Sequence, residues 1–300
     1  MTKNVLQELS DAFAAAVEQA GGYTVMVAGR RRMPASGILV EADLVLTAEH
    51  VLERNDEIGV GLPDGNLLRG KVAGRDRGTD LAVVRLEQPA GIPAETSRIV
   101  ARPGMLAPAV ARPGAGGVQA SLGFIQAVHG PLRFGRGALL EQSIHSDAAA
   151  LPGFSGGPLV DSEGRMLGIN TSGLVPGMLL TIPAEMALGI AGQLSKSGRV
   201  KRGYLGVRSQ TVELPEAAQA ELGRPQKLGL LVVRLESDGS AAKGGLLVGD
   251  ILVGAAGKPV EDHDDLTAGL SGESVGRQVE FEVLRGGKRV ILALMIVERP

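Results

Sequence analysis

Short apolar runs separated by turn-forming residues are the feature of this sequence that most restricts its fold. Between residues 23 and 182 these runs have the length of β-strands, and pieces rich in Gly, Pro, Asp and Asn, such as 63–66, separate them. Many short strands at this spacing predict an all-β barrel or sandwich rather than a helical bundle. Examples of the runs are Tyr23–Val27, Gly37–Val40, Leu44–Thr47, Ile58–Leu62 and Leu81–Leu86.

Helices and a second, smaller unit complete the expected organisation. Apolar residues at helical spacing predict an amphipathic helix over about residues 3–20, and Ala184–Leu194 has the pattern of another helix after Pro183. The polar, basic residues 199–203 are interpreted as a linker. The first domain is therefore expected over 1–198 and the second over 204–300, with a helix at Asp264–Leu270 between short strands.

Composition excludes several classes of function. The chain of 300 residues has a net charge of -2, which does not favour binding to nucleic acid or to an anionic membrane surface. The basic cluster Arg30–Arg32 is interpreted as a solvated hairpin tip. There are no cysteines, which excludes disulfides and Cys-ligated zinc. No apolar run is long enough to span a membrane.

The first 22 residues indicate the cellular compartment in which the protein is expected. Acidic residues interrupt any apolar stretch over 1–22, so this segment does not have the pattern of a signal peptide. We therefore expect a cytoplasmic protein from the chain as it stands, or a periplasmic or otherwise extracytoplasmic one if a leader has been removed.

The stretch LPGFSGGPLV, residues 151–160, concentrates backbone freedom around one hydroxyl group. Two glycines after Ser155 would weaken a helix or a strand. One interpretation is a tight loop that presents Ser155 and turns neighbouring N–H groups toward a common point. The alternative is an ordinary Gly/Pro turn.

A nucleophilic serine needs a base, and His50 is the best placed of the four histidines. It directly follows an apolar strand, and Asp80 immediately precedes the buried strand 81–86. A histidine takes the serine proton when a carboxylate holds its ring. The order His50, Asp80, Ser155 matches the chymotrypsin triad, which serves here as a known template.

The remaining histidines do not predict a metal site. No pair of them has zinc-ligand spacing, and the acidic run around His263 is interpreted as helix capping. We expect no metal and no other cofactor.

Three motifs resemble those of a known family. Thr47–Val51 resembles the histidine motif of chymotrypsin-fold serine proteases, Asp80–Val83 the aspartate motif and Gly153–Leu159 the serine motif. Residues 23–195 resemble such a protease, and the whole chain resembles the HtrA/Deg family, in which a PDZ domain follows it. The resemblance implies a mostly β fold, with a chymotrypsin-like double β-barrel followed by a small α/β PDZ domain.

The resemblance also implies an oxyanion hole at Gly153, Phe154 and Ser155, with the backbone N–H groups of Gly153 and Ser155 as donors. Phe154 departs from the family, which usually has Asn or Asp before the serine. Two hypotheses follow: the bulky side chain changes how the loop moves between resting and active forms, or it contacts substrate beyond the cleaved bond.

Substrate preference follows from the residues before Ser155. Ala149 stands where a trypsin-like pocket carries an acid, so cleavage after Lys or Arg is not expected. The resemblance implies that Ala150 lines the pocket, and a preference for apolar residues before the cut is expected. It further implies that substrate backbone is bound by Thr171, Ser172, Gly173 and Leu174.

In the second domain, Tyr204-Leu205-Gly206-Val207 resembles the carboxylate-binding loop of a PDZ domain. A peptide would then add as a strand beside the segment after Val207. Leu205, Val207, Leu266 and Leu270 would line its side-chain pocket; the alternative is that these residues belong to the core.

The resemblance implies a serine endopeptidase for unfolded or misfolded polypeptides, which binds C-terminal peptides at its PDZ domain. It also implies a homotrimer held near the N-terminus, for which Phe13 and Tyr23 are the aromatic candidates. Two alternatives stay open. One is a peptide-binding module or holdase chaperone with negligible turnover, and the other is an esterase, which would not need a PDZ domain.

Overall fold

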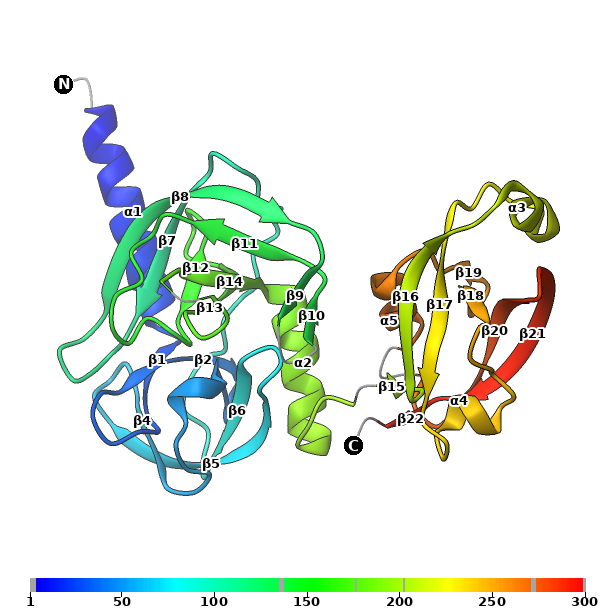
Figure 1. Cartoon of the computed structure of the whole chain (residues 1–300). Coiled ribbons are helices and arrows are strands. Elements are labelled where there is room, and N and C mark those ends of the chain that lie inside the picture. Colours follow the sequence, from blue (N-terminus) through cyan, green and yellow to red (C-terminus); the bar gives the residue numbers. More distant parts are fainter. Residues whose placement is uncertain (1–3, 135–137, 176, 202, 271–273, 299–300) are drawn as a thin grey trace. The chain divides into compact units, whose positions relative to one another are not determined.

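The computed structural model describes residues 4–134, 138–175, 177–201, 203–270 and 274–298. The chain divides into two compact units, Met1–Val200 and Lys201–Pro300, which are described separately (Figure 1). Both units are built mainly from strands, which confirms the mostly β class expected from the short apolar runs.

The first of two barrels in the first unit is closed and has six strands in the order β1-β2-β3-β6-β5-β4. A 3₁₀ turn, η1 (Glu49–Val51), follows β3. All five residues of β3 are buried, as are most of those in β6, because Val, Leu and Ala side chains fill both of their faces. The strands are β1 (Thr24–Ala28), β2 (Ala35–Glu41), β3 (Leu44–Ala48), β4 (Ile58–Gly61), β5 (Leu67–Asp76) and β6 (Leu81–Leu86).

A second closed barrel has the order β11-β14-β13-β12-β7-β8. One buried apolar cluster runs through both barrels, from Val25 in β1 to Ile182 in β14. The loops at the junction therefore rest on a common core. The strands are β7 (Leu106–Ala111), β8 (Gln119–His129), β11 (Ser143–Ser146), β12 (Pro158–Val160), β13 (Met166–Thr171) and β14 (Leu180–Pro183), with a separate pair, β9 (Leu132–Phe134) and β10 (Ala138–Leu140).

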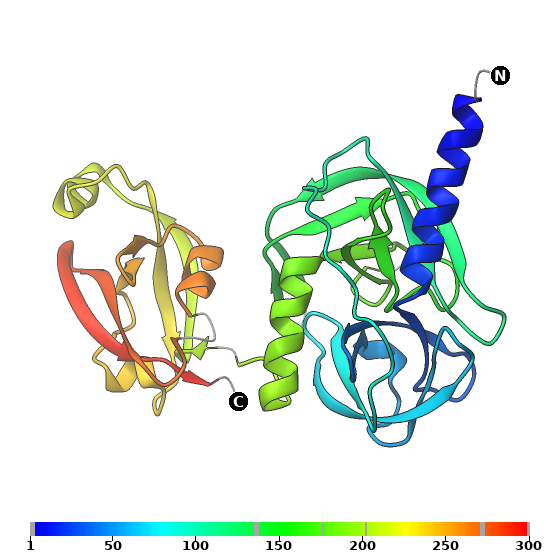
Figure 2. The same ribbon diagram turned by 180° about the vertical axis from the view of Figure 1, so that it is seen from behind.

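Two helices accompany the barrels (Figures 1 and 2). Helix α2 (Ala184–Ser197) begins after Pro183, packs on β5, β6 and β13, and ends at Gly198, whose φ of 74° suits glycine. Helix α1 (Val5–Gly21) buries Ala16 and Ala20 near its end, whereas its first turns extend away from the barrels and are exposed.

The second unit is a sheet of order β16-β17-β18-β20-β21, with β16 at one edge. Its helix α5 spans His263–Gly269, close to the range predicted from the sequence. Two short helices, α3 (Glu216–Leu222) and α4 (Ser240–Lys243), were not predicted. The strands are β15 (Gly203–Tyr204), β16 (Val207–Glu213), β17 (Leu228–Leu235), β18 (Ile251–Ala255), β19 (Lys258–Pro259), β20 (Gln278–Arg285), β21 (Lys288–Met295) and β22 (Val297–Glu298).

Within the described ranges, none of the helices combines the length and the apolar character that crossing a membrane would require.

A buried carboxylate closes the β12–β13 turn. Asp161, 1% exposed, accepts hydrogen bonds from Ser97 Oγ (2.6 Å), Glu163 N (2.9 Å) and Arg165 N (3.0 Å). Burial alone would raise the pKa of Asp161, but these hydrogen bonds outweigh burial and lower its pKa below the ordinary value. The ionised carboxylate is therefore the form that holds the turn.

We expect Asp161→Asn to lower the free energy of unfolding of the first unit at pH 7 by about 2 kcal/mol. Because the pKa of Asp161 is lower in the folded protein than in the unfolded chain, its ionised carboxylate stabilises the fold at any pH above the unfolded pKa. This stabilisation is lost as the pH falls through the folded-state pKa. The gap between wild type and variant should therefore shrink below about pH 4. Urea unfolding at several pH values measures it. The exposed Glu87→Gln is the control, and a gap independent of pH would contradict the assignment.

Candidate active site

Pairing between β3 and β6 brings His50 to Asp80. Ala48 lies opposite Leu81 in the ladder, so the residues just beyond each strand meet at the same end. There the Glu49 N–H donates to the Asp80 carbonyl oxygen at 2.9 Å. The local pairing of two buried strands thus fixes the backbone on which both side chains stand.

The Asp80 carboxylate is buried, with 4% of the residue exposed, and it holds the histidine from two sides. Its Oδ1 accepts from the His50 N–H at 2.9 Å, and its Oδ2 lies 2.7 Å from His50 Nδ1. The Thr171 hydroxyl, from β13 of the second barrel, also donates to Oδ2. A proton on Nδ1 satisfies this geometry, which leaves Nε2 as the basic nitrogen.

Asp76 supports the turn that carries Asp80. Its buried carboxylate accepts from Thr79 N at 3.1 Å, from Thr79 Oγ1 at 2.7 Å and from Gly78 N at 3.3 Å. Asp80 itself has a φ of 56°, in the left-handed region that costs free energy for a non-glycine residue. The Asp76 hydrogen bonds and the β3–β6 pairing hold Asp80 in this conformation.

Gly173 packs directly against the His50–Asp80 pair. A Cβ atom placed there would lie 2.5 Å from Asp80 Oδ2 and 2.6 Å from His50 Nδ1. Its N–H also donates to Thr171 Oγ1 at 3.0 Å. No side chain fits at this position without displacing the carboxylate or the imidazole.

Ser155 lies in the loop between β11 and β12, and only 6% of it is exposed. Its Oγ lies 3.0 Å from Ser172 Oγ and accepts from the Ser172 N–H at 3.2 Å. Across the residues that the structure describes, no hydrogen bond joins Ser155 to His50. The hydroxyl of Ser155 therefore contacts Ser172 in this state.

The residues before Ser155 form a tight turn. Phe154 N donates to Leu151 O at 3.1 Å, with Pro152 and then Gly153 in the central positions. Gly153 has a φ of 86°, so the turn matches type II, which favours this residue order.

The N–H groups of Gly153 and Ser155 are buried, and neither donates to another described residue. Buried backbone donors nearly always have a partner. Two unpaired ones beside a nucleophile are suited to bind an oxyanion.

Phe154 is an anchor of the loop and not a substrate contact. Its side chain is fully buried in the apolar cluster of the second barrel, with Leu159 and Leu167 among its neighbours. The hypothesis that Phe154 contacts substrate beyond the cleaved bond is therefore wrong, because no part of the side chain reaches the surface.

Ser36, at the start of β2, connects the first barrel to the loop around the candidate nucleophile Ser155. Residues 151–157 are called the nucleophile loop below. Its N–H donates to Ser155 O at 3.1 Å and its hydroxyl donates to Gly153 O at 2.7 Å. A Cβ atom at Gly156, where φ is 87°, would come within 2.0 Å of Ser36 O. Sequence reasoning missed Ser36, since a small polar residue in a strand gives no signal of a contact this distant.

Not all of the residues predicted to bind substrate are accessible at the surface. Ala150, Ser172 and Gly173 are exposed, and Leu174 is partly buried. Thr171 is fully buried and its hydroxyl is used by Asp80, so its side chain serves to position the carboxylate.

In the second unit, the predicted peptide-binding loop precedes the edge strand β16. Gly206 has a φ of 74°, and Val207 begins the strand. Leu205 and Leu266 are 1% and 6% exposed and belong to the core, whereas Val207 and Leu270 are partly buried. The core alternative therefore holds for Leu205 and Leu266.

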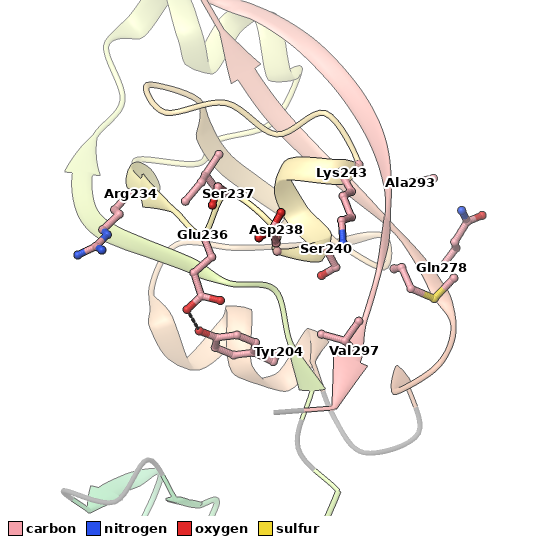
Figure 3. Close-up of a pocket in the computed structure, with 14 residues that line it drawn as sticks. Tyr204, Arg234, Glu236, Ser237, Asp238, Ser240, Lys243, Gln278, Ala293 and Val297 are labelled. Atoms are coloured by element: carbon pink, nitrogen blue, oxygen red, sulfur yellow. Dashed lines mark hydrogen bonds between the residues drawn. The ribbon is translucent and has the colours of Figure 1, made fainter. Parts of the chain in front are cut away.

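A cavity of about 830 Å³ lies elsewhere in this unit (Figure 3). Tyr204 lines it and its hydroxyl lies 2.5 Å from Glu236 Oε1. The remaining lining comes from residues 234–240, Lys243, Gly244 and the strands β20, β21 and β22, with no residue of β16 or α5. Of the residues predicted to bind the peptide, Tyr204 alone is among those that line this cavity. Within the described ranges, no group of three or more His, Cys, Asp and Glu side chains is suited to hold a metal ion.

Comparison with family models matches residues 35–169 to a trypsin-like peptidase domain and residues 203–296 to a PDZ domain. A probable periplasmic serine endoprotease DegP-like of Pseudomonas savastanoi is 34% identical over 88% of this chain and 56% of its own length. The Halomonas elongata protein of the same name is 32% identical over 90% of this chain and 57% of its own. The chain thus spans little more than half the length of these curated relatives.

Solved structures match over nearly their full length. The HtrA-type protease AlgW with a tripeptide has a TM-score of 0.81 and 31% identity, covering 96% of this chain and 97% of that one. The serine endoprotease from Yersinia pestis has a TM-score of 0.77 and 25% identity, covering 96% and 98%.

We expect Gly173→Ala to slow the reaction of Ser155 with a fluorophosphonate probe at least tenfold, because the added Cβ displaces His50 or Asp80. The labelling rate, read by mass spectrometry, measures the effect. Gly130→Ala is the matched control, since a Cβ at Gly130 meets nothing within 4 Å. Equal labelling rates for wild type and Gly173→Ala would contradict the geometry.

Proposed function

The chain belongs to the HtrA-type family of serine proteases, and on that premise we propose that it is a serine endopeptidase that cleaves unfolded or misfolded polypeptides. The observation that carries the proposal is the His50–Asp80 pair, 2.7 Å apart, beside a serine flanked by two unpaired N–H groups. The two compact units, which meet at residues 200 and 201, support residues 199–203 as the linker between protease and PDZ domains.

In the proposed mechanism, Ser155 Oγ attacks the peptide carbonyl carbon while its proton passes to His50 Nε2. Asp80 stabilises the imidazolium that forms. The intermediate collapses when His50 returns the proton to the leaving amine, which breaks the C–N bond and leaves an acyl-enzyme. Water, deprotonated by the same nitrogen, then releases the acid and restores Ser155.

The negative charge that develops on the carbonyl oxygen is stabilised by the N–H groups of Gly153 and Ser155. Each such donor is worth about 3 kcal/mol in the transition state. Since both donors lack an acceptor in the described chain, substrate supplies the missing partner.

Substrate preference is for an apolar residue before the cleaved bond. Ala149 offers no carboxylate to a basic side chain, and the exposed neighbours Ala150 and Leu151 are apolar. Ser172 and Gly173 bind the substrate backbone.

Peptide C-termini are the proposed partners of the PDZ domain, through strand addition at the free edge of β16. The relatives named as periplasmic support a periplasmic location for this chain as well.

A homotrimer is supported by exposed apolar residues at the start of α1, among them Val5 and Leu6 at 73% and 74% exposure. Tyr23 does not contribute to such a contact, because its ring is buried and its hydroxyl donates to Gly164 O at 2.6 Å. Phe13 is partly buried and stays a candidate.

One observation favours the alternative, a peptide-binding module or holdase with negligible turnover: Ser155 Oγ is engaged by Ser172 and not by His50. Casein degradation distinguishes the two functions. Wild type should fragment casein, Ser155→Ala should not, and Asp80→Asn should be about 10⁴-fold slower while keeping its fold. Absence of cleavage by wild type, even with added C-terminal peptides, would favour the binding module.

A further inference from the structure

The turn between β1 and β2 carries three consecutive arginines, Arg30, Arg31 and Arg32; residues 29–34 are called the arginine hairpin below. Arg31 and Arg32 are exposed. Arg30 Nε donates to Met33 O, which bends this side chain over the turn. No carboxylate in the described part of the chain forms an ion pair with any of the three, so their charge is available to a partner.

One end of the arginine hairpin is fixed to the segment that follows His50. Glu53 N donates to Gly29 O at 2.9 Å. A Cβ at Gly29 would lie 2.4 Å from Leu52 Cδ2 and 2.9 Å from Val51 O, so the backbones pack closely.

The other end is fixed to the nucleophile loop. Pro34 O lies 3.3 Å from the position that a Cβ of Gly153 would take. Ser36 then donates to Ser155 O and Gly153 O, as described above. The arginine hairpin therefore projects at the edge of the site, between the loop of the base and the loop of the nucleophile.

The surroundings add positive charge. Arg54 is exposed, and its Nη2 donates to Ala28 O at 3.0 Å, directly before the hairpin. The one nearby carboxylate that contacts the hairpin is Glu53, which accepts from the Arg31 backbone N–H at 3.3 Å. Among the described residues, the hairpin and Arg54 thus carry four guanidinium groups, and the contacting residue Glu53 carries one carboxylate.

The path of a bound substrate determines which of its residues the arginine side chains can contact. In the proposed function, residues before the cleaved bond lie along Ser172 and Gly173, in the second barrel. Residues after the bond then lie on the other side of Ser155, where Pro34 and Ser36 of the first barrel contact the loop around Ser155 and the arginine hairpin connects β1 to β2.

We propose that the arginine hairpin selects substrates with Asp or Glu in the first three positions after the cleaved bond. The inference rests on the proposed function and adds a determinant of specificity to it. Guanidinium groups bind carboxylates through paired hydrogen bonds, and a mobile peptide can align with whichever arginine it meets. Because the groups are exposed, the preference should be modest, about three- to tenfold in kcat/KM, and should weaken with salt.

Internally quenched peptides test the proposal. Each shares its sequence up to the cleaved bond, taken from a casein site that the protein cuts, and carries three Glu, three Gln or three Lys after it. Wild type should cleave the Glu peptide about three- to tenfold faster than the Gln peptide, with the Lys peptide slowest. The ratio should fall when the ionic strength rises from about 0.05 to 0.5 M.

The double variant Arg31→Gln/Arg32→Gln should bring the Glu-to-Gln ratio close to one, with circular dichroism confirming that it folds. Arg98→Gln/Arg102→Gln removes the same charge from exposed arginines between the barrels and should keep the wild-type ratio. Equal cleavage of the Glu and Gln peptides by wild type, or a preference that survives in the double variant, would overturn the inference alone. Failure to cut casein would instead overturn the proposed function, and the inference with it.

Discussion

The carboxylate of Asp80 is the point on which the candidate site depends. It holds both the backbone N–H and the Nδ1 atom of His50, and it receives the Thr171 hydroxyl from the other barrel. Gly173 closes over the same group without space for a side chain. Removing this carboxylate would leave the imidazole without orientation and would leave Thr171 without its acceptor. A charge-assisted network that spans two barrels also rigidifies the junction between them.

Much of the fold could be predicted because the signals of its strands are local, and a known template pointed to His50 and Asp80, which the structure brings together. Buried strands such as β3 and β6 appear as continuous apolar runs, and the residues flanking Ser155 form a motif of Gly and Pro whose backbone needs are specific. The contacts of Ser36 could not be predicted. It bonds to a residue 117 positions away, and nothing in a serine at the start of a strand indicates a partner at that distance.

The burial of individual apolar side chains also could not be predicted from the sequence. A contact with substrate or a partner was one hypothesis for Phe154, Tyr23 and Leu205, and each of the three is buried. Residue type does not distinguish an aromatic ring that anchors a loop from one that contacts a partner protein. Moving the ring out of water is favourable in both cases. The distinction is made by tertiary packing, here by the apolar cluster of the second barrel around Phe154.

The bonds from Ser36 to the nucleophile loop and from Thr171 to Asp80 have a consequence for biosynthesis. His50 and Asp80, the proposed base and its carboxylate, belong to the barrel that leaves the ribosome first, whereas Ser155, the proposed nucleophile, arrives with the second. The Thr171 hydroxyl reaches Asp80, and Ser36 reaches the loop around Ser155, only when the two barrels have met. A half-made chain therefore lacks Ser155, and a complete but half-folded chain lacks the contacts between the barrels, so we expect neither to digest itself or its neighbours.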